Sequence, residues 1–139
     1  MLEICFELEF TIPSCEVDSI GNLCQGNYLK YLEVARYKLF ESIGCSYEDI
    51  ENHKIVCPVI KINMSFLGAI KAEQPIKLRC FLQNIEPALL VDYEIYDKKS
   101  GELLFAGCSV QTYVDAESGK TFEKAPEFLK EAVKKAING

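Results

Sequence analysis

The stretch NYLKYLEVARYKLFESI, residues 27–43, decides the fold. Ten of the sixteen residues from Tyr28 to Ile43 are apolar, and the charged residues occupy a narrower stripe. Because an ordinary surface helix has one apolar stripe, this helix is expected to be covered on several sides. Gly44 follows at a position where helices commonly end in a left-handed residue. The stretch therefore predicts one long, buried helix.

Strand patterns lie on both sides of this helix. Residues 4–12 alternate strictly between large apolar side chains and other residues, which is typical of a half-buried strand. A short polar helical turn over 46–53 leads to four further strand-like runs, at approximately 54–67, 75–86, 89–97 and 102–115. Short connections suit antiparallel hairpins and occur at 86–87, 97–101 and 116–119. We therefore expect a four-strand meander.

The chain ends in an amphipathic pattern, APEFLKEAVKKAI, which predicts a terminal helix with Pro126 in its first turn. The element order indicates a single α+β domain over residues 1–139, with an antiparallel sheet of five to six strands wrapped around one long central helix. A single helix cannot cover both faces of such a sheet. The remaining apolar surface predicts a second copy, as a homodimer or homotetramer.

Composition excludes several classes of function. The chain has 15 Lys and Arg against 21 Asp and Glu, a net charge of −6, so no nucleic-acid partner is expected. No apolar run approaches the roughly 20 residues of a membrane span, and no signal peptide is recognisable. Seven cysteines without a CxxC pair indicate the reducing cytoplasm, and most of them are expected to be small core fillers.

The sequence offers almost no histidine for catalysis or metal binding. His53 is the only histidine and lies in the polar stretch EDIENHK, where a surface position is expected. Zinc sites built on paired histidines are excluded, and neither GxGxxG nor a P-loop pattern occurs. We expect no metal and no cofactor.

The chemically informative segment is DSIGNLCQGNYLKYLEVAR, residues 18–36. It places the carboxylate of Asp18 in a loop, followed by a glycine-containing turn and a helix N-terminus. Free backbone N–H groups and a partial positive charge at a helix start polarise a carbonyl and stabilise an oxyanion. A nearby carboxylate can attack the carbonyl carbon or activate water. A turn-forming aspartate is the simpler alternative, and the spacing alone favours it.

The segment resembles the signature of hotdog-fold thioesterases of the 4-hydroxybenzoyl-CoA thioesterase family. The element order is also that of the family, and CPVIKINMSFLGAI resembles its next strand. The positions that match in register are Asp18, Gly21, Leu23, Asn27 and Tyr28.

This resemblance implies hydrolysis of an acyl-CoA or acyl-carrier-protein thioester without a cofactor. It assigns Asp18 as nucleophile or general base, and the backbone N–H of Gln25 as the donor that polarises the thioester carbonyl. Gly26, Asn27 and Tyr28 are expected to contact the substrate.

Two other side chains are candidates for catalysis. A related hotdog branch uses a helix carboxylate, which corresponds to Glu33, although its spacing to Lys30 and Arg36 favours ion pairs on the helix surface. Cys24 lies near the site but has no adjacent histidine to activate it.

The hotdog resemblance leaves two other functions as alternatives. A hotdog dehydratase relies on a histidine, and the single histidine lies outside the motif. A non-catalytic acyl-CoA binding module is the remaining alternative, and the retained Asp18 argues against it.

Overall fold

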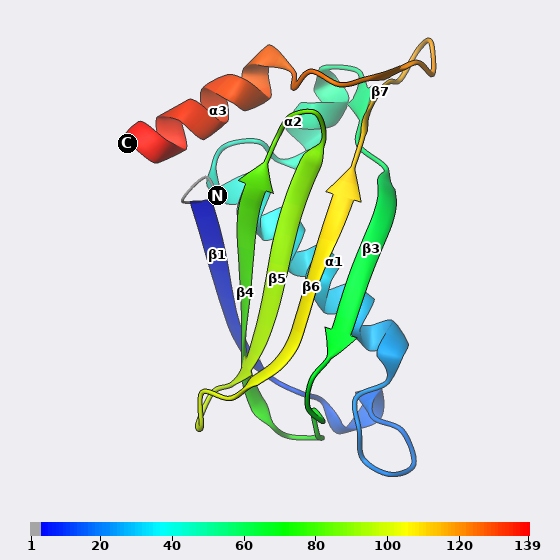
Figure 1. Cartoon of the computed structure of the whole chain (residues 1–139), viewed down its shortest axis with the longest axis vertical. Helices are drawn as coiled ribbons and strands as arrows, with labels where there is room; N and C mark the ends of the chain where they lie inside the picture. Colours follow the sequence, from blue (N-terminus) through cyan, green and yellow to red (C-terminus); the bar gives the residue numbers. More distant parts are fainter. Residues whose placement is uncertain (1–3) are drawn as a thin grey trace.

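The computed structural model describes residues 4–139 (Figure 1). The sheet strands are β1 (Ile4–Thr11), β3 (Val59–Phe66), β4 (Pro75–Asn84), β5 (Leu89–Asp97) and β6 (Leu103–Gln111). The helices are the 3-10 turn η1 (Ser14–Glu16), α1 (Gln25–Ser42), α2 (Tyr47–Asn52) and α3 (Glu127–Asn138). A small second sheet contains β2 (Ile55–Val56), β7 (Tyr113–Asp115) and β8 (Thr121–Phe122).

The main sheet is antiparallel and has the order β1-β4-β5-β6-β3. The expected α+β architecture with a five-stranded sheet and one long helix is confirmed. The meander is confirmed for β4, β5 and β6 but is wrong for β3, which pairs with β6 at the opposite edge from β1 (Figure 1). The connection 67–74 is too long for a tight hairpin, and it carries the chain to the far side of the sheet, where β4 pairs with β1.

Two of the expected strands are each divided in two. Pro58 separates β2 from β3, since proline cannot donate to a strand ladder. Thr112 separates β6 from β7, and its N–H donates to the Pro58 carbonyl instead of continuing the ladder (3.2 Å). The chain therefore leaves the main sheet at these two neighbouring points and forms the small sheet.

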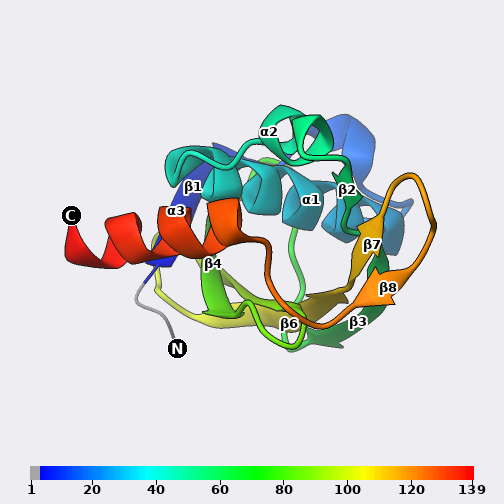
Figure 2. The same cartoon turned by 90° about the horizontal axis from the view of Figure 1, so that it is seen from above.

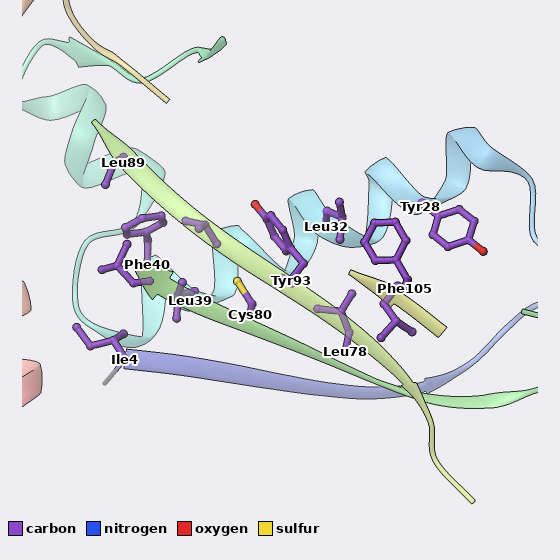
Figure 3. Packing of buried hydrophobic residues seen from close by; sticks show 14 of the residues in the cluster. Ile4, Tyr28, Leu32, Leu39, Phe40, Leu78, Cys80, Leu89, Tyr93 and Phe105 are labelled. Atoms are coloured by element: carbon purple, nitrogen blue, oxygen red, sulfur yellow. The ribbon is translucent and has the colours of Figure 1, made fainter. Parts of the chain in front are cut away.

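Helix α1 lies across the inner face of the main sheet (Figure 2). The alternation expected for residues 4–12 is confirmed in β1, and β4 and β5 alternate in the same way. In the core, Leu32, Leu39 and Phe40 of α1 lie over Leu78 of β4 and Tyr93 of β5 (Figure 3).

Within one chain, the sheet covers one side of α1, and α2 packs on part of the other, where the rings of Tyr37 and Tyr47 lie 4.1 Å apart (Figure 2). Leu29, Val34 and Tyr37 are 37%, 39% and 43% exposed on its remaining surface. The single chain therefore covers the helix only in part. The helix also begins two residues earlier than the apolar pattern indicated, at Gln25.

The ion pairs expected for Glu33 are wrong. Arg36 is 3% exposed and turns inward, where its Nη1 donates to the hydroxyl of Tyr93 (3.1 Å), which in turn lies 2.7 Å from Ser109 Oγ. Lys30 pairs with Glu16. Within residues 4–139, neither cation forms an ion pair with Glu33, because each has a partner from another element.

Most cysteines do not fill the core, contrary to expectation. Only Cys45 and Cys80 of the seven are buried, and all seven are free thiols. The strand alternation puts Cys5 on the outer face of β1, whereas Cys15 is exposed in η1.

The helices at the upper end of the sheet follow the sequence signals closely. Ser46 and Asp49 form a reciprocal capping box at the start of α2. Pro126 is the residue directly before α3 and not, as predicted, part of its first turn. His53 is exposed, as expected, and its ring stacks on Phe128 of α3 with 3.8 Å between centroids. In the part of the chain that the structure describes, no helix is long and apolar enough to cross a membrane.

Candidate active site

Asp18 occupies a tight turn between η1 and α1. Its N–H donates to the Asn22 carbonyl (2.8 Å), and its own carbonyl accepts from Gly21 (3.0 Å), whose φ of +84° suits glycine. Oδ1 of Asp18 accepts the N–H groups of Ile20 (3.1 Å) and Asn22 (3.0 Å). Asp18 thus does form the turn. Its second oxygen, Oδ2, accepts no hydrogen bond from residues 4–139.

The turn is fastened to the segment that follows β3. Leu23 N–H donates to the Ile70 carbonyl (2.8 Å), and the Lys71 ammonium donates to Asn22 Oδ1 (2.5 Å). These contacts join two parts of the chain almost fifty residues apart in sequence. They hold the Asp18 turn beside the end of β3.

The N-terminus of α1 lies at the same place. Cys24 is the residue before the helix, in an extended conformation (φ −67°, ψ 140°), and its side chain caps no N–H of the described chain. The N–H groups of Gln25 and Gly26 belong to the first turn, which has no preceding helical carbonyls to accept them. They are therefore available to an oxygen atom placed at the helix start, where the helix dipole favours negative charge.

A cavity of about 560 Å³ connects these elements. Its lining combines the turn, the helix start and the chain after β3: Asp18, Asn22, Leu23, Cys24, Gln25, Tyr28 and residues 66–70. Tyr28 is 4% exposed, and its ring packs against Phe66 (edge-on, 4.9 Å between centroids) and Phe105 (stacked, 5.1 Å). Burial raises the pKa of Tyr28, so its phenol is neutral. The cavity lining therefore combines polar groups of the turn and the helix start with the aromatic side chains of Tyr28 and Phe66.

The structure brings together three of the five residues singled out from the sequence. Asp18, Gln25 and Tyr28 line one cavity. Gly26 and Asn27 are not among its lining residues, and the Asn27 side chain donates to the Glu16 carbonyl (2.9 Å). No group of three or more potential metal-ligating side chains occurs in residues 4–139.

The lining contributed by residues 66–70 was missed from the sequence. Gly68 was the available signal, because a glycine directly after a strand often marks a close approach of the backbone. A Cβ at this position would lie 2.8 Å from Leu104 Cδ2. The segment passes tightly over the start of β6, and this passage forms one wall of the cavity.

This sheet, helix and cavity define a hotdog-fold protein, and solved structures agree. The DHNA-CoA thioesterase from Staphylococcus aureus superposes with a TM-score of 0.83 at 25% identity, over 96% of this chain and 91% of that one. SAV2348 from S. aureus, solved in complex with CoA, gives a TM-score of 0.85 over 99% and 87% of the two chains; at 13% identity it shows the fold alone.

The chain belongs to the thioesterase-like superfamily, whose model matches residues 13–133. It is 30% identical over 116 residues to a Bacillus subtilis (strain 168) protein named "Putative acyl-CoA thioesterase YneP", covering 83% of each chain. The expected family and hotdog fold are confirmed, and the chain is a thioester hydrolase.

Proposed function

We propose that the protein hydrolyses the thioester of an acyl-CoA or of an acyl carrier protein in the cavity at the start of α1. The observation that carries this proposal is that the Asp18 carboxylate and the α1 N-terminus line one cavity. The names of YneP and of the S. aureus DHNA-CoA thioesterase support a CoA ester as substrate, as does the CoA bound to SAV2348.

In this proposal the thioester carbonyl oxygen accepts the Gln25 N–H at the start of α1. The resulting polarisation makes the carbonyl carbon electrophilic, and the oxyanion is stabilised by the helix N-terminus. Asp18 then acts through Oδ2, while Oδ1 keeps the carboxylate fixed in the turn. It either attacks the carbon to give an acyl anhydride that water cleaves, or removes a proton from an attacking water. The thiolate of CoA or of the carrier protein leaves in both routes, and neither uses a metal or cofactor.

The acyl group is proposed to lie against the aromatic residues of the cavity lining. Tyr28 and Phe66 offer ring surface there, and Leu67 adds an aliphatic side chain. Apolar surface of this kind favours an apolar acyl group over a charged one.

The proposal includes a homodimer or homotetramer, with the copies meeting along β3. In the described chain, β3 is an edge strand whose only partner is β6. Val59, Ile60 and Phe66 of this strand are 42%, 60% and 44% exposed, a surface that an isolated edge strand would rarely leave uncovered. Because Phe66 also lines the cavity, a second copy on this edge would border the substrate site.

The proposal also covers the domain organisation and the location of the protein. Residues 1–139 act as one hotdog domain, and the protein works in the cytoplasm. The second is supported by the seven free cysteines, since a reducing compartment keeps thiols unpaired.

The alternative is a hotdog module that binds acyl-CoA without cleaving it. We would measure thiol release with a thiol-trapping dye over a panel of acetyl-, hexanoyl-, lauroyl- and benzoyl-CoA, and over one acyl carrier protein loaded with the same groups. The proposal predicts catalytic turnover of at least one substrate. Saturable binding by calorimetry without thiol release would refute it and establish the binding module.

A further inference from the structure

Glu16 connects the two halves of the candidate site through its backbone. It is the last residue of η1 and stands two positions before Asp18. Its carbonyl oxygen accepts two hydrogen bonds, one from the Cys24 N–H (3.1 Å) and one from Asn27 Nδ2 (2.9 Å). Cys24 directly precedes α1, and Asn27 lies in its first turn. The carbonyl of Glu16 therefore closes the loop that contains Asp18 onto the helix start.

The side chain of Glu16 makes a second connection one turn further along α1. One carboxylate oxygen binds the Lys30 ammonium, and the other accepts the hydroxyl of Tyr31. Tyr31 is itself held by β1, because its ring stacks on Phe10 with 4.4 Å between centroids. The Glu16 side chain is only 16% exposed. Hydrogen bonding by Lys30 holds the pKa of Glu16 below its ordinary value, so the carboxylate is charged at neutral pH.

Together these contacts fix both ends of the loop 17–24. Val17 and Leu23 pair across it, so a shift of Glu16 relative to α1 would move the whole turn. The distance that matters for hydrolysis is the one between Asp18 and the N–H groups of the helix start. Glu16 is the described residue that binds the helix start, the next helical turn and the loop at once.

We propose that Glu16, held by its contacts with Tyr31 and Lys30, is a positioning residue. It keeps the Asp18 carboxylate at a fixed distance from the N-terminus of α1. This inference rests on the proposed function, since it assigns Asp18 the chemical step. It also gives Asn27 a role: its amide secures the loop to the helix. Glu16 touches neither substrate nor reacting atoms and acts only through geometry.

An ordinary surface ion pair is the competing explanation, and the chain contains a matched example. Glu9 of β1 pairs with Lys98 (3.0 Å) and Lys77 (3.9 Å), but its side chain is 47% exposed and is not part of the cavity lining. Exposed pairs contribute little to stability or geometry. Glu9→Gln therefore controls for the loss of one glutamate charge from an ion pair.

The test compares Glu16→Gln, Tyr31→Phe, the double variant and Glu9→Gln. Tyr31→Phe keeps the ring that stacks on Phe10 and removes only the hydroxyl, so it preserves the packing if Glu16→Gln folds poorly. On the best acyl-CoA substrate, we expect kcat to fall about tenfold or more in each single variant, because small misplacements of a reacting group are costly. KM should stay within about twofold, and the double variant should be little worse than the poorer single one. Glu9→Gln should match wild type.

A measurement independent of turnover completes the test. Hydrogen exchange at the amides of residues 18–24 should accelerate in Glu16→Gln and Tyr31→Phe but not in Glu9→Gln. Unchanged exchange in these amides would overturn the positioning role whether or not the protein hydrolyses acyl-CoA. Accelerated exchange in a variant that keeps the wild-type kcat would show that the contacts of Glu16 with Lys30 and Tyr31 do not matter for catalysis, and would overturn the proposal. Absence of thiol release by wild type would refute the proposed function alone, because the exchange data would still decide whether Glu16 anchors the loop.

Discussion

Asp18→Asn separates the two roles that the structure gives to Asp18. The asparagine carbonyl oxygen can still accept the N–H groups of Ile20 and Asn22, so the turn is retained. What disappears is the negative charge on the second oxygen, the one proposed to act on the thioester. The substitution therefore removes the chemistry and leaves the loop in place.

The size of the effect follows from these contacts. Removing a positioned general base typically costs about 10²–10⁴ in rate, equivalent to about 2.7–5.5 kcal/mol of activation free energy. The two hydrogen bonds become neutral rather than charge-assisted, which weakens but does not abolish them. Because Asp18 is exposed, we expect a loss of at most about 1 kcal/mol in the free energy of unfolding.

Asp115 provides the matched control. Its Oδ1 also accepts two backbone N–H groups, from Glu117 (2.9 Å) and Ser118 (2.8 Å), in the turn between β7 and β8. We expect Asp18→Asn and Asp115→Asn to shift the melting temperature similarly, by a few degrees, while only Asp18→Asn loses kcat by a factor of 10²–10⁴. A kcat for Asp18→Asn within threefold of wild type would exclude Asp18 as the reacting carboxylate and direct attention to Glu33.

Four further outcomes are expected. Gln25→Pro removes the proposed backbone donor at a helix position that tolerates proline, and it should lower kcat about 10²–10³-fold. Gln25→Ala should keep most of the activity. Equal, severe losses in both variants would mean that the Gln25 side chain does the chemistry. Ile60→Lys should convert the oligomer to monomer in sedimentation velocity, and an unchanged sedimentation coefficient would move the interface away from β3. Activity should survive EDTA, and loss that zinc restores would contradict a metal-free site. Asp97 has its pKa lowered from 3.8 to about 2, chiefly by the Gln74 side chain, so its contribution to stability is complete above about pH 4 and is lost as pH falls toward 2. Asp97→Asn should therefore flatten the acid dependence of the melting temperature in that window, and an unchanged slope would count against the shift.

Local patterns predicted the individual elements well, because the forces behind them act between near neighbours in the chain. Strict alternation in residues 4–12 and the apolar run of α1 were sufficient for β1 and for the central helix. The position of β3 was not predictable in this way. Its pairing with β6 instead of β4 depends on contacts between strands some forty to fifty residues apart, and an apolar run does not specify its partner.

The candidate site shows the same difference between residues that a local pattern predicts and residues that only long-range contacts bring in. Asp18, Gln25 and Tyr28 lie within eleven residues of one another, and a short motif captured them. The wall formed by residues 66–70 comes from a distant segment joined to the turn by the Leu23–Ile70 hydrogen bond. Glu16 gave no signal, because a glutamate in a polar stretch is ordinary until the fold places Tyr31 beside it.

Residue spacing along the helix also could not predict that the side chain of Arg36 turns inward. The charge pattern of α1 favoured a surface position beside Glu33, and i,i+3 geometry is compatible with that arrangement. The decisive partner is the hydroxyl of Tyr93 on β5, which also lies against Ser109 of β6, and only the folded sheet brings it to the guanidinium.

The most direct test of the site is a crystal structure with an acyl-CoA analogue in which a methylene group replaces the thioester sulfur. Such a ketone keeps the carbonyl but cannot be hydrolysed. We predict its oxygen about 3 Å from the backbone nitrogen of Gln25 at the start of α1. An oxygen of Asp18 should lie roughly 3–3.5 Å from the carbonyl carbon, or reach it through one bound water. A carbonyl bound away from the α1 N-terminus, with Asp18 contacting no part of the acyl group, would contradict the assignment of this cavity as the active site.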